Sequence, residues 1–142
     1  MKKTIVVQNI CGFRFFAENE GGTRIVIDGE NPPLGLRPME LLLASLGSCT
    51  AYDVVSIMKK KRVPLARYRV EVEGERAEKH PKRYTKIVVR HVGSGPGVTE
   101  KALRHAAELS HEKFCSVSAN LNAEIVLEVV VEPWEENGSS TK

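Results

Sequence analysis

The stretch PMELLLASLGSCTAYDVVSIM, residues 38–58, predicts one long helix that is apolar around nearly its whole circumference. Pro38 suits the first turn of a helix, where its missing N–H leaves no hydrogen bond unmade. The helix should end at about Lys61, and about twenty helical residues span about 30 Å. A helix that is apolar on all sides is buried in protein or in a membrane. Because Glu40 and Asp53 interrupt the apolar run, we expect burial inside protein.

The residues on either side of this helix predict strands grouped around two helices. Alternating apolar and polar residues predict the strands, and Thr99 is expected to cap a second, amphipathic helix that reaches Phe114. The predicted strands cover residues 4–9, 13–17, 23–29, 66–78, 83–92 and 123–133. Strands that cluster around helices without strict alternation indicate an α+β fold, here in the order βββ-α-ββ-α-β.

The composition is that of one soluble globular domain. The chain has 142 residues, of which 42% are hydrophobic and 27% charged. We assign residues 1–134 to a single domain and residues 135–142 to a polar, disordered tail. A net charge of +3, spread along the chain, gives no reason to expect a nucleic acid or a membrane as partner. The N-terminal apolar run is too short and broken for a signal peptide, so the predicted location is cytoplasmic.

The length of the central helix also predicts the oligomeric state. A helix of about 30 Å would span a small domain, and one chain of 142 residues has little material to cover all of its sides. We therefore expect a homodimer in which strands from two chains enclose both long helices.

Three cysteines, Cys11, Cys49 and Cys115, are expected to be reduced in a cytoplasmic protein. Cys49 lies among small residues of the central helix, and Gly47 there costs about 1 kcal/mol relative to alanine. This cost implies that another element approaches closely, one that could carry a second thiol. Burial raises the pKa of a thiol unless a cation favours the anion. Cys49 is therefore either an inert packing residue or has a cationic neighbour.

Cys115 ends the second predicted helix, in the segment ELSHEKFCSVS of residues 108–118. His111 precedes it by four residues, a spacing that would suit two metal ligands. A surface histidine beside charged neighbours explains His111 more simply, and a metal site normally needs four clustered ligands, so we expect no metal. Cys11 lies in the first hairpin turn without a partner pattern, and we regard it as a bystander.

PMELLLASLGSCTAYDVVSIM together with ELSHEKFCSVSANL, residues 108–121, resembles the OsmC/Ohr family of osmotically induced and organic-hydroperoxide-resistance proteins, in particular its OsmC-like branch. The likeness covers nearly the whole predicted domain. It implies an intertwined α+β homodimer with thiol peroxidase chemistry, in which Cys49 is the peroxidatic cysteine and Cys115 the resolving one. It further implies that no metal, haem, flavin or other bound cofactor is needed and that an external dithiol restores both thiols.

The chain departs from this resemblance where the thiolate is activated. Ohr-type members carry a glutamate directly after the first proline of the helix, and this glutamate holds an arginine over the thiolate. Here that position is Met39, and Glu40 follows it. Glu40 and Cys49 lie about 180° apart around a helix, so a favourable place beside the helix dipole explains Glu40 at least as well. Asp53 shares the face of Cys49 and either anchors an arginine or belongs to another site.

The activating arginine has three candidates in the N-terminal part of the chain. We favour Arg37, which precedes the helix, and after it Arg14 in the first hairpin; Arg24 begins the third strand. Each also fits an ordinary solvated surface charge.

Three functions follow from these patterns. The first is thiol-dependent reduction of small organic hydroperoxides or hydrogen peroxide at a site on the dimer interface. The second is a stress-related protein that binds a small apolar ligand there and uses the cysteines for packing, which Met39 favours. The third, nucleic-acid binding through the basic residues 59–62, is weak because no aromatic platform accompanies them.

Overall fold

The computed structural model describes residues 1–135, so the predicted tail lies outside the described residues except for Glu135. The elements follow the predicted order and confirm the α+β fold. The strands are β1 (Ile5–Cys11), β2 (Arg14–Asn19), β3 (Arg24–Asp28), β4 (Arg67–Arg76), β5 (Tyr84–Ser94) and β6 (Glu124–Val131). The helices are α1 (Pro38–Lys60) and α2 (Glu100–Leu109), followed by a π-helical turn, η1 (Ser110–Phe114), and a 3-10 turn, η2 (Ser118–Asn120).

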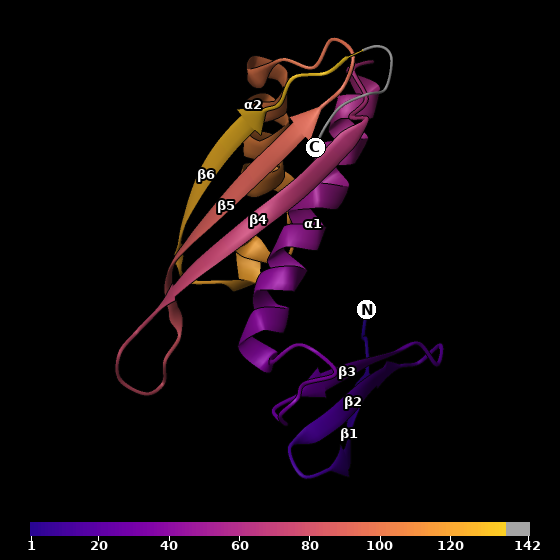
Figure 1. Cartoon of the computed structure of the whole chain (residues 1–142), viewed down its shortest axis with the longest axis vertical. Helices are drawn as coiled ribbons and strands as arrows, with labels where there is room; N and C mark the ends of the chain where they lie inside the picture. The colour runs from indigo at the N-terminus through magenta and orange to yellow at the C-terminus, as the bar shows by residue number, and fades with distance from the viewer. Residues whose placement is uncertain (136–142) are drawn as a thin grey trace. The chain divides into compact units, whose positions relative to one another are not determined.

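These elements form two compact units, which Figure 1 shows in the colours of the chain. The first unit comprises Met1–Leu42 and the second begins at Leu43, so the boundary lies within α1. The assignment of residues 1–134 to a single domain stays a prediction.

The first unit is an antiparallel sheet in the order β1-β2-β3, followed by the loop that leads to α1. Asp28 anchors this loop, because its buried carboxylate accepts hydrogen bonds from the backbone N–H of Glu30 at 2.9 Å and of Leu34 at 2.6 Å. Arg14 Nε lies 2.9 Å from the same carboxylate. Burial alone would raise the pKa of Asp28, but these backbone hydrogen bonds and Arg14 lower it below its ordinary value. Asp28 is therefore a structural anion.

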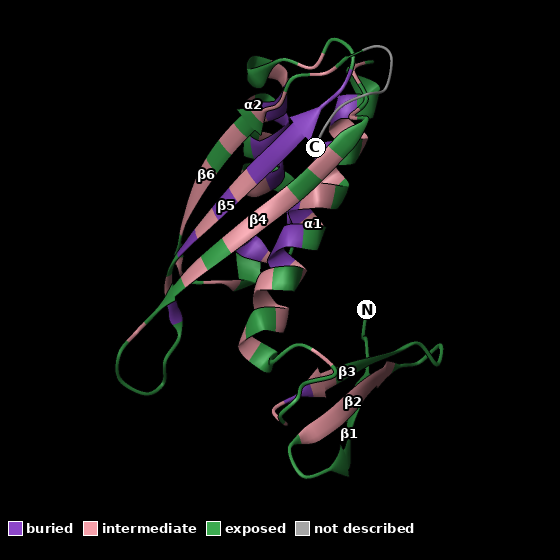
Figure 2. Ribbon diagram, in the orientation of Figure 1, coloured by how far each residue is buried: buried purple, intermediate pink, exposed green. Residues whose placement is uncertain are grey.

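The sheet of the first unit leaves much apolar surface open to solvent. No residue of β1 is buried, and Figure 2 shows β1 exposed along its length. The exposed apolar residues of this unit include Ile5, Val6, Val7, Ile10, Phe13, Ile25, Val26, Leu34 and Leu36. A contiguous apolar surface on a small sheet is typical of a surface that another molecule covers.

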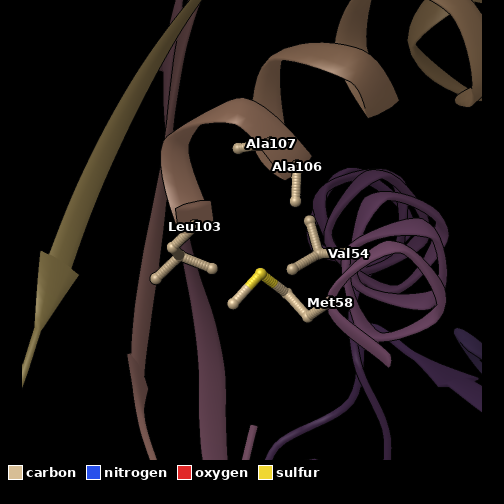
Figure 3. Close-up of a cluster of buried hydrophobic side chains, with 5 residues drawn as sticks. All are labelled: Val54, Met58, Leu103, Ala106 and Ala107. Carbon is tan, nitrogen blue, oxygen red and sulfur yellow. The ribbon is translucent and has the colours of Figure 1, made fainter. Parts of the chain in front are cut away.

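The second unit is a sheet in the order β4-β5-β6 with helices on one face (Figure 1). β4 and β5 form the predicted antiparallel pair. β6 runs parallel to β5, which is possible because α2 carries the chain back along the sheet. The core between the sheet and the helices contains Val54 and Met58 of α1 and three residues of α2, which Figure 3 shows. The α2 residues are Leu103, Ala106 and Ala107.

Gly47 lies where α1 packs most closely on the sheet. A Cβ atom at this position would lie 2.9 Å from Val72 Cγ2 of β4, closer than nonbonded carbon atoms approach. The close approach predicted from Gly47 is therefore confirmed, and the element that makes it is β4.

The opposite face of the second sheet carries charges in place of a core. Arg90 of β5 contacts Glu71 of β4 at 3.0 Å and Glu128 of β6 at 2.7 Å. Because all three side chains are partly exposed, water screens both pairs and each contributes little to stability. This face is suited to contact with solvent.

Helix α1 stays largely uncovered within one chain. Its most apolar 18-residue window has a mean hydropathy of 1.5, enough by length and composition to cross a membrane, and 28% of that window is buried. Tyr52 and Val55 are 79% and 49% exposed. The helix ends with Arg62 at φ 64°, and Val63 N–H bonds to Met58 O at 3.1 Å, as in a Schellman motif.

Candidate functional site: a thiol pair beside a small cavity

The two cysteines singled out in the sequence meet in the second unit. Cys49 is half-buried on α1, and Cys115, which follows η1, is 4% exposed. The Cys49 side chain lies close enough to the Cys115 thiol to help raise its pKa. The fold therefore makes neighbours of two sulfurs that are far apart along the chain, while their catalytic roles stay a prediction. Cys11 is an exposed free cysteine at the end of β1.

The backbone holds Cys115 on both sides. Its N–H bonds to Ser110 O at 2.7 Å, the i to i−5 bond that closes the π turn. Its Sγ accepts a hydrogen bond from the backbone N–H of Ser118 at 3.4 Å, and Ser118 Oγ donates to Cys115 O at 3.1 Å. π turns are frequent at functional sites because they re-aim the residues around them.

The surroundings of Cys115 keep it protonated. Burial raises the pKa of the Cys115 thiol most, the Ser118 N–H opposes this, and the neighbouring Cys49 raises it further. At neutral pH Cys115 is therefore an S–H group. Of the two sulfurs, Cys115 is the less suited to attack a substrate as a thiolate.

Asp53 joins a chain of hydroxyl groups next to this pair. Ser110 Oγ donates to Asp53 Oδ2 at 2.8 Å, and Thr50 Oγ1 lies 2.8 Å from Ser110 Oγ. Ser110 is completely buried and Thr50 is 4% exposed. Within the described part of the chain, Asp53 thus binds a hydroxyl group and forms no ion pair with an arginine. Sequence reasoning missed Ser110 and Thr50 as site residues.

A small cavity adjoins Cys115. Its volume is about 10 Å³, which is about the space that one water molecule needs. Polar side chains on its wall are Thr50, His111, Cys115 and Ser118, and the apolar ones are Leu46, Val89, Ile125 and Leu127. All of these residues belong to the second unit, so the cavity is a feature of one chain.

Glu40 has a structural partner at the start of α1. Its Oε1 accepts the backbone N–H of Arg37 at 2.9 Å. This is the bond that the third residue of a helix makes in a capping box, and it accounts for an acid at this position. A catalytic role of Glu40 stays a prediction.

The three candidate arginines differ in their partners. Arg14 binds Asp28, and Arg24 lies 3.1 Å from Glu18 and stacks on the Phe16 ring at 4.7 Å. Arg37 is exposed, and its guanidinium forms no ion pair with any described residue. Of the three, Arg37 therefore has the guanidinium most available for another group. No cluster of three or more His, Cys, Asp or Glu side chains that could bind a metal occurs among residues 1–135.

Comparisons with known proteins agree with the two sequence motifs. The family model described as OsmC-like protein matches residues 29–130. Protein YhfA of Escherichia coli K12 is 35% identical over 115 residues, which cover 81% of this chain and 86% of YhfA.

Two solved structures extend the comparison to the whole fold. A hypothetical protein from Aquifex aeolicus is 39% identical with a TM-score of 0.85, over 96% of this chain and 99% of the other. The organic hydroperoxide resistance protein OhrB of Bacillus subtilis has the same fold, with a TM-score of 0.62 at 15% identity over 93% and 98% of the two chains. The resemblance read from the sequence is confirmed: the chain belongs to the OsmC-like protein family.

Proposed function

We propose that the chain reduces organic hydroperoxides or hydrogen peroxide with Cys49 and Cys115. The observation that carries the proposal is that Cys49 and Cys115 are neighbours inside the second unit, close enough for Cys49 to raise the pKa of the Cys115 thiol. Membership in the OsmC-like family, and a fold shared with a protein described as an organic hydroperoxide resistance protein, support it. We propose that the protein acts in the cytoplasm as part of a stress response.

The proposed reaction has three steps. The Cys49 thiolate attacks one peroxide oxygen and the O–O bond breaks. The departing alkoxide, or hydroxide in the case of hydrogen peroxide, takes a proton from solvent and leaves as alcohol or water. Cys49 is then a sulfenic acid. Cys115 attacks the Cys49 sulfur, the S–O bond breaks, and water leaves as the disulfide forms. An external dithiol then reduces the disulfide by exchange, so the cycle needs no bound cofactor.

The environment of each sulfur supports this division of roles. Cys49 is the more exposed of the two and so the more accessible to a peroxide. Cys115 is the more buried sulfur, and burial raises the pKa of its thiol, which suits a group that reacts second. A guanidinium near Cys49 would favour its thiolate, and Arg37 is the candidate we propose for it.

The active form is proposed to be a homodimer. The first unit exposes a broad apolar surface and α1 is mostly uncovered. A second copy of the chain offers matching apolar surfaces, and burying them would stabilise the assembly by about 25 cal/mol for each Å². Sedimentation of the purified protein at micromolar concentration tests this assignment directly.

Peroxide treatment of the reduced protein tests the chemistry. Rapid mixing with cumene hydroperoxide should give a Cys49–Cys115 disulfide in the mass spectrum. Cys115→Ser should stop at a Cys49 sulfenic acid that dimedone traps, and Cys49→Ser should not react at this site. Cys11→Ser is the matched control and should behave as the wild type. Thiols that stay reduced in the wild type at pH 7 would reject the peroxidase.

The residues at the position where the resemblance places the thiolate-activating glutamate favour a second function, the binding of a small apolar ligand. Met39 replaces the glutamate expected after Pro38, and Glu40 caps the helix. A stress-related protein that binds a small apolar ligand would need neither thiolate nor arginine. In that case the double variant Cys49→Ser/Cys115→Ser should bind an apolar fluorescent probe such as anilinonaphthalene sulfonate as tightly as the wild type does.

A further inference from the structure

Thr50, Ser110 and Asp53 form an unbroken hydrogen-bonded chain from the cavity at Cys115 toward a half-buried carboxylate. The two links measure 2.8 Å each. We propose that this chain is a proton relay that takes the proton Cys115 loses when it attacks the oxidised Cys49. The proposal rests on the proposed function and adds three residues to its second chemical step.

The direction of the relay follows from the donors and acceptors available. An ionised carboxylate only accepts, so Ser110 gives its single hydroxyl proton to Asp53. In the bond between the two hydroxyl groups Thr50 is then the donor and Ser110 the acceptor. Thr50 Oγ1 keeps lone-pair capacity for a proton from elsewhere. Each group along the chain is thus set to receive a proton from the side of Thr50 and pass one toward Asp53.

The cavity links this relay to Cys115. Thr50 and Cys115 both line it, and its volume of about 10 Å³ suits one water molecule. A buried water needs two to four polar partners, and the wall offers the groups of Thr50, Cys115 and Ser118. A water held there would bridge the Cys115 thiol and Thr50 Oγ1.

The second chemical step creates the need for such a path. Cys115 must lose its proton to become a nucleophile, yet it is 4% exposed and cannot hand the proton to bulk water directly. Burial also raises the pKa of this thiol, which makes ionisation harder.

The relay would act as follows. The Cys115 proton passes through the cavity water to Thr50, the Thr50 proton to Ser110, and the Ser110 proton to Asp53. The Cys115 sulfur forms the S–S bond, and the S–O bond of the Cys49 sulfenic acid breaks with its electron pair going to oxygen. The departing hydroxide takes a proton from solvent and leaves as water, and the half-buried Asp53 returns its proton to solvent. The net step is then balanced: thiol plus sulfenic acid give disulfide plus water.

A structural role for the network and a proton acceptor at His111 are the two alternatives to the relay. In a merely structural role, the network would tie α1 to the π turn, and its loss would lower stability without a specific effect on one chemical step. His111 also lines the cavity and could accept the Cys115 proton in place of the relay.

Stopped-flow kinetics can separate these roles because the two chemical steps give different products. Sulfenic acid formation is followed with a trapping reagent, and disulfide formation by quenching and mass spectrometry. The variants are Thr50→Val, which keeps the shape and removes the hydroxyl, Thr50→Ser, which restores it, Asp53→Asn and His111→Gln. Ser48→Ala removes an exposed hydroxyl of the same helix, whose hydrogen bonds within residues 1–135 go to α1 carbonyls, and is the matched control.

We expect Thr50→Val and Asp53→Asn to form the sulfenic acid as fast as the wild type and to slow disulfide formation at least about tenfold at pH 7. Thr50→Ser, His111→Gln and Ser48→Ala should keep the wild-type rate. The solvent deuterium isotope effect on disulfide formation should be larger in the wild type than in Thr50→Val.

A wild-type disulfide rate in Thr50→Val overturns the relay even if Asp53→Asn fails to fold. A loss confined to His111→Gln also overturns it and assigns the proton to the imidazole. If the wild type forms no sulfenic acid at all, the proposed peroxidase is refuted, an outcome distinct from both.

Discussion

His91 makes the stability of the second unit depend on pH. It lies at the centre of β5, is completely buried, and its Nδ1 is 2.7 Å from the Tyr68 hydroxyl, with the two rings stacked at 6.0 Å. Its Nε2 has no hydrogen-bond partner among the described residues. Burial lowers the pKa of His91 from 6.5 to about 4, because a charged imidazolium would have to stay in the core without solvent.

The size and sign of the effect follow from this pKa. Below pH 6.5 the unfolded chain binds a proton at His91, while the folded chain stays neutral until about pH 4. The free energy of unfolding therefore falls as the pH drops through this window and levels off below it. At about 1.4 kcal/mol per pH unit the loss amounts to about 3 kcal/mol. The total free energy of unfolding of a small domain is only about 5–15 kcal/mol, so this loss is a large part of it.

Urea unfolding at several values between pH 7 and pH 4 measures this loss. His91→Gln is the matched variant, because its amide can bond to Tyr68 but does not titrate. Subtracting the two pH profiles removes the contribution of the carboxylates, which both proteins share. Between pH 7 and pH 4, the free energy of unfolding of the wild type should fall by about 3 kcal/mol more than that of His91→Gln. Parallel profiles over this range would show that His91 protonates in the folded protein without cost, and the argument from burial would be wrong.

Three further predictions concern α1 and its ends. Gly47→Ala should destabilise the protein by about 1 kcal/mol, because overpacking against Val72 outweighs the gain in helix propensity; adding Val72→Ala should relieve this clash in a double-mutant cycle, whereas additive effects would contradict it. Arg62→Gly should raise the free energy of unfolding by about 0.5–1 kcal/mol, since φ is 64° there, and a lower urea midpoint would contradict the strain. Glu40→Ala should cost about 0.5–1 kcal/mol through the lost capping bond, while Glu40→Gln should cost less; unchanged stability with lost peroxide reduction would instead make Glu40 catalytic.

Local pattern was sufficient to predict the order and type of the elements. The apolar circumference of residues 38–58 and the stripe on residues 103–107 each give a helix, and alternation gives the strands. The parallel pairing of β6 with β5 could not be predicted in this way. It depends on how α2 carries the chain across the sheet, and neither strand has a sequence pattern that indicates it. The π turn at Ser110 likewise has no sequence pattern, since it depends on one backbone bond that skips an extra residue.

The two thiols of the candidate site were predicted from the sequence, but the hydroxyl groups beside them were missed. The two thiols were matched through resemblance to a family, not through their spacing. From the sequence, Thr50 is only one of the small residues around Cys49, and Ser110 is only part of the predicted second helix. A hydroxyl on an otherwise apolar face is a usable signal, because a buried hydroxyl needs a partner. His91 gave no comparable signal within an alternating strand.

The residues around Cys49 are small because several other elements approach α1 closely there. Gly47 lets Val72 of β4 occupy the space that a Cβ atom would otherwise fill. Two residues later Cys49 lies beside Cys115, and Thr50 and Asp53 bond to the hydroxyl of Ser110. One stretch of α1 thus contacts a strand, a thiol and a π turn within two helical turns. Larger apolar side chains in this stretch would hold these elements apart. If Cys115 is the resolving thiol, as proposed, its burial makes a proton path through the protein useful, and Thr50 of this stretch with Ser110 of the π turn would form the proposed one.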